Sequence, residues 1–307
     1  MITVADAAPA LRIGLIGLDS SHAVAFTKTI NAAEPAPELE NAKVIAAFPG
    51  GSPDLPTSAD RIEGFTQQIT DMGIEIVPSI EALLKKVDAV IMNSVDGRVH
   101  LEQARPVLEA GIPLFIDKPI AASLADTKEL IALSKKTGTP FFSSSTLRYC
   151  QEVIDLNKED VVGCVAYSPC KLDPTHPDLF WYGIHGVETL FTVMGPGCES
   201  VQRTQADGTE IVTGVWKDGR VGTFRGIRDG SYGYGVVVFG KKGIELTKIR
   251  ARYDLLVVEI VKFFRTKQPP VSPEQTLEIV AFMTAADMSR DADGETIAMA
   301  GLMSDKQ

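Results

Sequence analysis

A short apolar stretch that ends at a glycine constrains the fold more than any other part of this sequence. The apolar run Ile13–Ile16 is followed by Gly17 and then by a segment of helical character, Ala23–Asn31. A strand that turns at glycine into a helix is how dinucleotide-binding α/β domains begin. The usual fingerprint is G-x-G-x-x-G, but here Asp19 and His22 stand at the later glycine positions. The stretch therefore predicts a fold and leaves nucleotide binding open.

The composition is that of an ordinary globular protein, and it narrows the possible partners. The chain has 307 residues, a length that favours two domains. Its net charge of −10 argues against nucleic acid or an anionic membrane as a partner, because both require a basic surface. The 4 cysteines form no C-x-x-C pair, and no apolar run reaches the roughly 20 residues of a membrane span. We expect a cytoplasmic protein with reduced thiols.

The first half of the chain alternates strand and helix signals. Strands are expected at residues 13–16, 43–48, 75–77, 88–94, 114–117 and 139–143, and helices at 23–31, 59–72, 79–86, 99–110 and 123–136. Strands separated by helical crossovers predict an α/β fold with a doubly wound, parallel, Rossmann-type sheet that binds ligands at its carboxyl edge. This domain is expected to cover residues 1–145, and Met1–Ala10 reads as a short leader without the basic region of a signal peptide.

The pattern changes in the second half, which we expect to form a second domain over residues 146–307. Strands follow closely on one another, with turn pairs such as Asp207-Gly208 and Asp218-Gly219 between them. They are expected at 161–172, 200–205, 210–217, 220–227, 233–239 and 243–248, with helices at 183–194, 253–265 and 273–290. This predicts an open, largely antiparallel sheet whose uncovered face suits a second subunit, and a terminal helix free to pack back on the first domain.

Two groups of residues carry the chemistry of the expected site. Lys118 follows the fifth strand at the ligand edge of the sheet, where an ammonium group can hold a substrate oxygen or donate a proton. His185 and Glu188 are three residues apart, so on a helix they share a face, and histidine suits acid–base work near neutral pH. The alternatives are a surface lysine before a proline turn and a core histidine bonded to backbone. No histidine spacing supports a metal site, so none is predicted.

Three short motifs, in their order along the chain, resemble those of the glucose–fructose oxidoreductase, inositol dehydrogenase and MocA family of NAD(P)-dependent oxidoreductases. Gly14-Leu-Ile-Gly17 stands at the glycine turn, and Asp117-Lys118-Pro119 resembles the family's E-K-P motif. Gly183-x-His185-x-x-Glu188 resembles its G-x-H-x-x-D motif. The correspondence covers nearly the whole chain.

The resemblance implies hydride transfer between NAD or NADP and a carbinol carbon of a sugar, cyclitol or related polyol, in a homodimer or homotetramer formed through the second sheet. Lys118 would hold the substrate oxygen, His185 would take or give the hydroxyl proton, and Glu188 would orient the substrate or the histidine. The implied substrate contacts are Arg148, His176, Trp181 and Tyr182. The implied cofactor contacts are Gly14, Gly17, Asp19, Ser20, Ser21, His22, Ser52, Ser94 and Asp117.

Departures from the family pattern fall in the cofactor half. Asp19 places a carboxylate beside the expected diphosphate, and two charges about 4 Å apart repel by roughly 4 kcal/mol at an effective dielectric near 20. The acidic residue expected after the second strand, for the adenosine ribose, is replaced by Pro49-Gly50-Gly51-Ser52. The absence of this acid is compatible with NADP, whose 2′-phosphate Arg61 could bind. It is equally compatible with no dinucleotide at all. Asp96 adds another acid after the fourth strand.

Two hypotheses of different class remain. The first is an NAD(P)-dependent oxidoreductase with Lys118 and His185 as catalytic groups. The second is a relative that has lost the dinucleotide and acts as a ligand-binding or regulatory protein, or as a lyase or hydrolase. The first is favoured because Lys118, His185 and an acid at Glu188 all stand in motif register.

Overall fold

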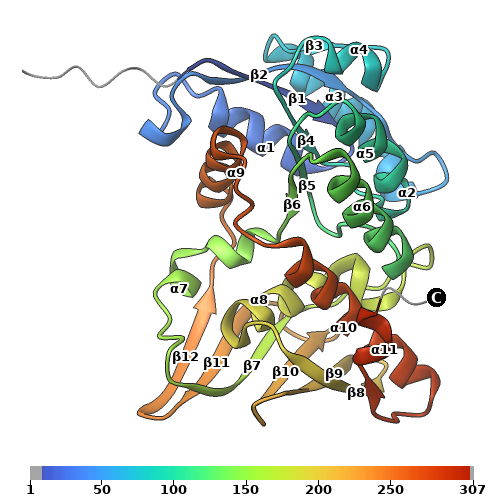
Figure 1. The fold of residues 1–307 in the computed structure, drawn as a ribbon, viewed down its shortest axis with the longest axis vertical. Helices are drawn as coiled ribbons and strands as arrows, with labels where there is room; N and C mark the ends of the chain where they lie inside the picture. Colours follow the sequence, from blue (N-terminus) through green and yellow to red (C-terminus); the bar gives the residue numbers. More distant parts are fainter. Residues whose placement is uncertain (1–8, 305–307) are drawn as a thin grey trace, which may run out of the picture. The chain divides into compact units, whose positions relative to one another are not determined.

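A computed structural model describes residues 9–304, so most of the expected leader Met1–Ala10 lies outside the described chain. The described residues form two compact units (Figure 1). The first takes residues up to 117, 129–142 and 253–270, and the second takes 118–128, 143–252 and those from 271 onward. The expected boundary after residue 145 differs from this division, because residues 118–128 belong to the second unit and residues 253–270 to the first.

The first unit is built on a 6-stranded sheet in the order β3-β2-β1-β4-β5-β6. The pairings of β1 with β2 and β4, of β2 with β3, and of β4 with β5 are all parallel. The strands are β1 Leu11–Ile16, β2 Ala42–Phe48, β3 Glu75–Ile76, β4 Ala89–Met92, β5 Leu114–Ile116 and β6 Phe141–Ser143. The doubly wound order predicted from the sequence is confirmed.

The central strands form where the apolar runs are continuous. Every residue of β4 and β5 is buried, as in parallel strands covered by helices on both faces. In β1, Gly14 allows a helix to approach, because a Cβ there would lie 3.0 Å from the side chain of Leu83. The helices of this unit are α1 Ser21–Ile30, α2 Pro56–Ala59, α3 Ile62–Asp71, α4 Ile80–Leu84, α5 His100–Glu109 and α9 Asp254–Thr266, with α6 Leu124–Thr137 entering from residue 129.

One predicted helix is wrong in its bounds. The stretch 59–72 was expected to be a single helix, but it is divided into α2 and α3. The helix starts early because Pro56 occupies its first turn, where no backbone N–H is needed. It breaks at Arg61, whose N–H bonds to the carbonyl of Ser58, three residues back, instead of continuing the α pattern.

The second unit contains a 7-stranded sheet in the order β12-β11-β7-β10-β9-β8-β13. Its pairings are antiparallel except for that of β7 with β10, so the predicted open, mixed sheet is confirmed. The strands are β7 Val161–Pro169, β8 Cys198–Ala206, β9 Thr209–Trp216, β10 Val221–Ile227, β11 Tyr234–Gly240, β12 Gly243–Ile249 and β13 Ile297–Ala298. Helices α8 Ile184–Met194 and α10 Pro273–Asp291 complete its main elements.

Helix α8 lies very close to the sheet, which fixes the position of its first turn. A Cβ on Gly186 would lie 2.3 Å from the ring of Phe224 in β10. A Cβ on Gly222 would lie 2.9 Å from Leu190. Glycine on both sides of the contact therefore lets helix and strand approach, and larger residues would push His185 away from its neighbours.

The start of this helix differs from the sequence prediction. The chain was expected to enter an α-helix at Gly183, but residues Leu179–Gly183 form a π-helix (η4) that runs into α8. Such turns are rare and are frequently found at functional sites. The remaining short elements are η1 Pro37–Leu39, η2 Gly97–Val99, η3 Thr146–Tyr149, α7 Gln151–Ile154 and α11 Ala300–Met303. None of the described helices has the length and apolar character needed to cross a membrane.

Candidate active site

The predicted acid–base histidine lies at the start of α8 in the second unit. Its Nδ1 is 2.7 Å from the hydroxyl of Ser145, and His185 is only 7% exposed. The same hydroxyl accepts a bond from the backbone N–H of Leu147, so Ser145 is itself held by the turn after β6. This contact fixes the orientation of the imidazole ring, which an acid–base histidine requires.

Glu188 shares the face of α8 with His185, as predicted, but its carboxylate has other partners. The Ser144 hydroxyl donates to it at 2.6 Å, and Nε of Arg148 donates at 2.7 Å. Both Glu188 and Arg148 are largely buried, so the ion pair neutralises the carboxylate locally. Glu188 thus anchors the segment after β6, whereas the contact on His185 comes from Ser145.

Tyr182 connects the two predicted catalytic residues. Nζ of Lys118 lies 5.8 Å from the centroid of its ring, and the imidazole of His185 lies 5.3 Å from it in an edge-on arrangement. The hydroxyl of Tyr234, in β11, is 3.4 Å from that of Tyr182. An ammonium group, an imidazole and two phenols therefore surround one small region of the second unit, a combination that can bind and deprotonate a hydroxyl group.

The other predicted substrate residues are in the segment before α8. His176 is buried, its ring centroid lies 4.8 Å from that of Trp181 in a tilted arrangement, and its Nδ1 is 2.8 Å from the hydroxyl of Thr175. His176 thus packs beside Trp181, which is itself half-buried next to Tyr182.

Sequence reasoning missed Ser144, Ser145 and Tyr234. The serines directly follow β6, and polar residues after a parallel strand are a signal that was available. Tyr234 carries no comparable signal, since its position beside Tyr182 depends on how β11 pairs with β7.

In the first unit, the glycine turn requires Gly17. Its φ is +84°, and a Cβ there would lie 2.3 Å from the backbone nitrogen of Ser94. The N–H groups of Gly17 and Leu18 donate to the carbonyls of Phe48 and Pro49 at 3.0 and 2.8 Å. The turn after β1 is therefore tied to the loop after β2 and lies against the loop after β4.

Both carboxylate oxygens of Asp19 accept hydrogen bonds from other loops of the first unit. The Ser58 hydroxyl donates to one of its oxygens at 2.6 Å, and the N–H of Val95 donates to the other at 3.0 Å. The residue is fully buried, and this burial raises the pKa of its carboxyl group. The carboxyl thus joins the loops after β2 and β4 through both of its oxygens.

The remaining turn residues are arranged around the start of α1. Ser20 is its N-cap, with the hydroxyl accepting from the N–H of His22 at 3.2 Å. Nδ1 of His22 lies 2.5 Å from a carboxylate oxygen of Asp117, and its ring contacts that of Tyr253. Ser21 begins the helix itself. Most of the predicted cofactor residues are thus gathered at the carboxyl edge of the first sheet.

The loop after β4 is held by a similar set of contacts. The hydroxyl of Ser94 donates to Gln103, and Nε2 of His100 lies 2.8 Å from the Ser94 carbonyl. Asp96 is buried but bonds to Arg98, which also bonds to Asp54. The acid noted after the fourth strand is therefore neutralised within the loop.

A groove of about 620 Å³ opens at the same edge of the first unit. Its lining includes Gly50 and Gly51 after β2, the start of α4 and one side of α5. Next to it, the hydroxyl of Ser52 is buried without a hydrogen-bond partner in the loop after β2. Because a nucleotide ribose is normally bound at this point, an unsatisfied hydroxyl and an adjacent groove fit an adenine nucleotide. Within residues 9–304, no group of three or more histidine, cysteine or acidic side chains is arranged for a metal.

Comparison with known proteins agrees with a nucleotide-binding fold in the first unit. Residues 11–145 match the family model described as an oxidoreductase family with an NAD-binding Rossmann fold. The predicted family resemblance is confirmed over these residues. Among curated proteins no match to the chain is found.

Solved structures share the fold at low sequence identity. Scyllo-inositol dehydrogenase from Lactobacillus casei, with bound NAD(H) and scyllo-inositol, is 15% identical with a TM-score of 0.75, covering 95% of this chain and 100% of that one. GenD2 from gentamicin A biosynthesis, in complex with NAD, is 15% identical with a TM-score of 0.75, covering 96% and 97%. An oxidoreductase from Agrobacterium radiobacter, in complex with NAD⁺, L-tartaric acid and magnesium, is 14% identical with a TM-score of 0.73, covering 96% and 100%.

Proposed function

We propose that this protein is an NAD-dependent oxidoreductase that oxidises or forms a CH–OH group in a sugar, cyclitol or related polyol. The observation that carries the proposal is the arrangement of Lys118 and His185 around Tyr182, in a chain whose first half matches an NAD-binding family. A basic nitrogen and an ammonium group near one phenol are what a carbinol needs to lose its hydroxyl proton.

The roles of the protein groups follow from their contacts. Nε2 of His185 takes the hydroxyl proton in oxidation and returns it in reduction, while Ser145 holds Nδ1. The ammonium group of Lys118 binds the substrate oxygen and stabilises negative charge that develops there. Bound NAD supplies the hydride acceptor, and the first unit offers Gly17, Ser20 and Ser52 for holding it.

The charge of the groove favours NAD over NADP. Its lining includes the carboxylates of Glu81, Glu102 and Glu109 and one cation, Arg105, which is already paired with Glu129. A 2′-phosphate would add about two negative charges to this acidic lining, whereas a ribose hydroxyl adds none. The arginine considered for NADP, Arg61, is not part of the groove lining.

A titration tests the cofactor proposal directly. We expect NADH fluorescence and calorimetry to show saturable binding, with NADPH at least about tenfold weaker because of the acidic groove. Charge-neutralising Glu81→Gln should improve NADPH binding more than NADH binding. An absence of binding by both nucleotides at millimolar concentration would instead support the non-redox alternative, a ligand-binding protein, lyase or hydrolase.

We also propose that the open face of the second sheet pairs with a second copy of the chain. Large exposed apolar side chains lie there, on the face opposite α8: Ile211, Val215, Val221, Phe239, Ile244 and Leu246. Their exposure is unusual for a monomer, because contiguous apolar patches mark protein contacts.

Light scattering coupled to size exclusion should therefore report a dimer or tetramer for the wild type. Replacing Ile244 and Leu246 by lysine should dissociate it, since both side chains are about two-thirds exposed or more in the single chain (71% and 66%). Met288→Lys, which changes an exposed apolar residue on α10, is the matched control and should leave the assembly intact. A monomeric wild type would exclude this pairing.

A further inference from the structure

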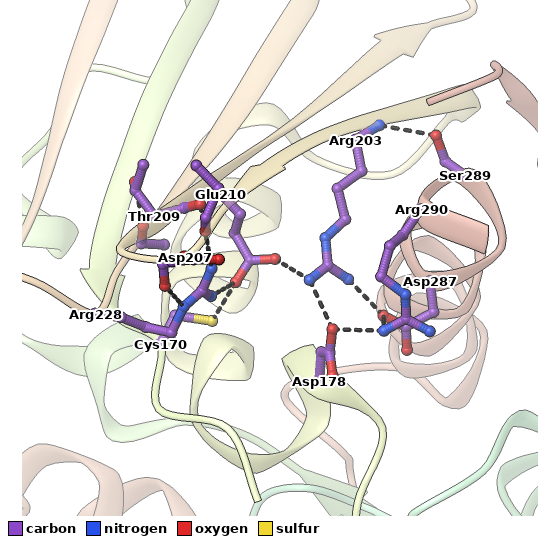
Figure 2. A network of polar contacts seen from close by, with 12 residues as sticks. Cys170, Asp178, Arg203, Asp207, Thr209, Glu210, Arg228, Asp287, Ser289 and Arg290 are labelled. Carbon is purple, nitrogen blue, oxygen red and sulfur yellow. Dashed lines mark hydrogen bonds and ion pairs between the residues drawn. The ribbon is translucent and has the colours of Figure 1, made fainter. Parts of the chain in front are cut away.

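A buried network of charged side chains centres on Arg203 in β8 (Figure 2). Its side chain is fully buried and divides its guanidinium between three carboxylates. Nη1 donates to Asp287 at 2.7 Å, and Nη2 donates to Asp178 at 2.8 Å and contacts Glu210. Around it, Arg290 donates to Asp178 at 2.5 Å, so the carboxylate of Asp178 is held from two sides.

The network touches both ends of the π-helix Leu179–Gly183. Asp178 directly precedes its first residue. At its other end, a Cβ on Gly183 would lie 3.0 Å from Sγ of Cys170, so the turn is packed against that cysteine. The thiol of Cys170 donates to Glu210 at 2.9 Å, and Glu210 pairs with Arg203. One guanidinium thus connects the beginning and the end of the same turn.

Stability alone is a poor explanation for such a network. Removing charges from water is costly, and a buried ion pair is often no more stabilising than apolar residues of the same volume. Nε of Arg203 is moreover buried without a partner, which adds to that cost. A π-turn, in contrast, is an uncommon conformation that persists only where surrounding contacts determine it. The fork of an arginine can fix several oxygens at once.

The π-helix carries the aromatic residues of the candidate active site. Trp181 contacts the ring of His176, and Tyr182 contacts both His185 and Lys118. Because these residues belong to a single five-residue turn, a shift of either end changes where both rings lie.

We infer that Arg203 is a positioning residue for the substrate site: through Asp178 at one end and Glu210 with Cys170 at the other, it holds the π-helix that places Trp181 and Tyr182. The substrate-site part of this inference rests on the proposed function. The placement of the rings does not, and it can be measured without a substrate.

Tryptophan fluorescence measures the placement. The chain has 2 tryptophans, so Trp216→Phe leaves Trp181 as the sole reporter. In that background, Arg203→Lys keeps the positive charge but removes the planar guanidinium group that bonds to several carboxylates at once. Acrylamide quenching of Trp181 should therefore increase roughly twofold or more. The measurement is made at about pH 8, because burial raises the pKa of Asp287 to about 6 and its carboxylate is then ionised.

Two further variants make the test decisive. Arg220→Lys, which alters an arginine bonded to Asp218 and the Met194 carbonyl in the same unit, is the matched control and should leave quenching unchanged. Asp178→Asn keeps the side-chain volume at a partly exposed position and should increase quenching like Arg203→Lys, which covers the case in which Arg203→Lys does not fold. Unchanged quenching in the folded Asp178→Asn variant would overturn the inference.

A kinetic measurement separates positioning from a purely structural role. With a substrate identified by turnover, Arg203→Lys and Asp178→Asn should raise KM by about tenfold while kcat stays within about threefold, because Lys118 and His185 remain. A lower melting temperature with unchanged KM and unchanged quenching would make the network structural only. If no nucleotide binds, the proposed function fails, and the quenching result still decides whether Arg203 positions Trp181.

Discussion

His185→Asn should lower kcat by roughly 10²- to 10⁴-fold while NADH affinity remains close to that of the wild type. Asparagine preserves a hydrogen bond to Ser145 but cannot exchange a proton, so only the acid–base step is lost. The proposed nucleotide contacts lie in the first unit and His185 in the second, which keeps the two measurements separate. Steady-state turnover of NAD with the best polyol from a substrate panel, together with the NADH titration, measures both.

The matched control for this variant is the same substitution at His176. That ring is buried against Trp181 and bonds to Thr175, so His176→Asn should alter KM and lower kcat by less than about tenfold. Equal losses of kcat in both variants would remove the acid–base role from His185. A His185→Asn enzyme with wild-type kcat would have the same consequence.

Gly17→Ala should destabilise the first unit by about 3 kcal/mol or more and abolish nucleotide binding. A residue with a Cβ is strained at a φ of +84°, and that Cβ would lie 2.3 Å from a backbone atom of Ser94, which cannot rotate away. The loops after β1 and β4 must therefore separate. Thermal unfolding should show a transition lowered by roughly 5–10 °C or more.

Gly111→Ala provides the control because it shares the backbone strain without the collision. Gly111 has a φ of +74° and no atom within 4 Å of the position its Cβ would take. The expected loss is about 1 kcal/mol, with NADH binding retained. Similar losses in the two variants would show that the contact between Gly17 and Ser94 does not matter for stability.

The fold was predictable because its main elements follow local rules. Continuous apolar runs gave the central strands β1, β4 and β5. The turn pairs between the strands of the second unit gave its antiparallel hairpins. The π-helix before α8 was not predictable, because a π-turn differs from an α-turn by one residue and depends on contacts made elsewhere, such as those of Asp178.

In the candidate site, too, some features were predictable from the sequence and others depend on the tertiary structure. Motif spacing put His185 and Glu188 on one face of a helix, and the structure has them there. Their partners, Ser145 and Arg148, come from the segment after β6, so only long-range pairing reveals which of them contacts the histidine and which the carboxylate. Tyr234 and the network of Arg203 are likewise invisible without the sheet register.

The turn at Gly17 shows most clearly which features follow from the sequence and which depend on the tertiary structure. By itself the sequence determined that a strand turns into a helix at Gly17, because the apolar run, the glycine and the helical pattern are local. It also indicated that Asp19 would oppose a diphosphate. Only the tertiary structure shows which groups bind this carboxyl group: the Ser58 hydroxyl and the Val95 N–H, which stand far along the chain, donate to it, and burial raises its pKa. The type of a residue gives its possible charge. The direction in which its side chain points and its protonation state depend on the groups that the fold places around it.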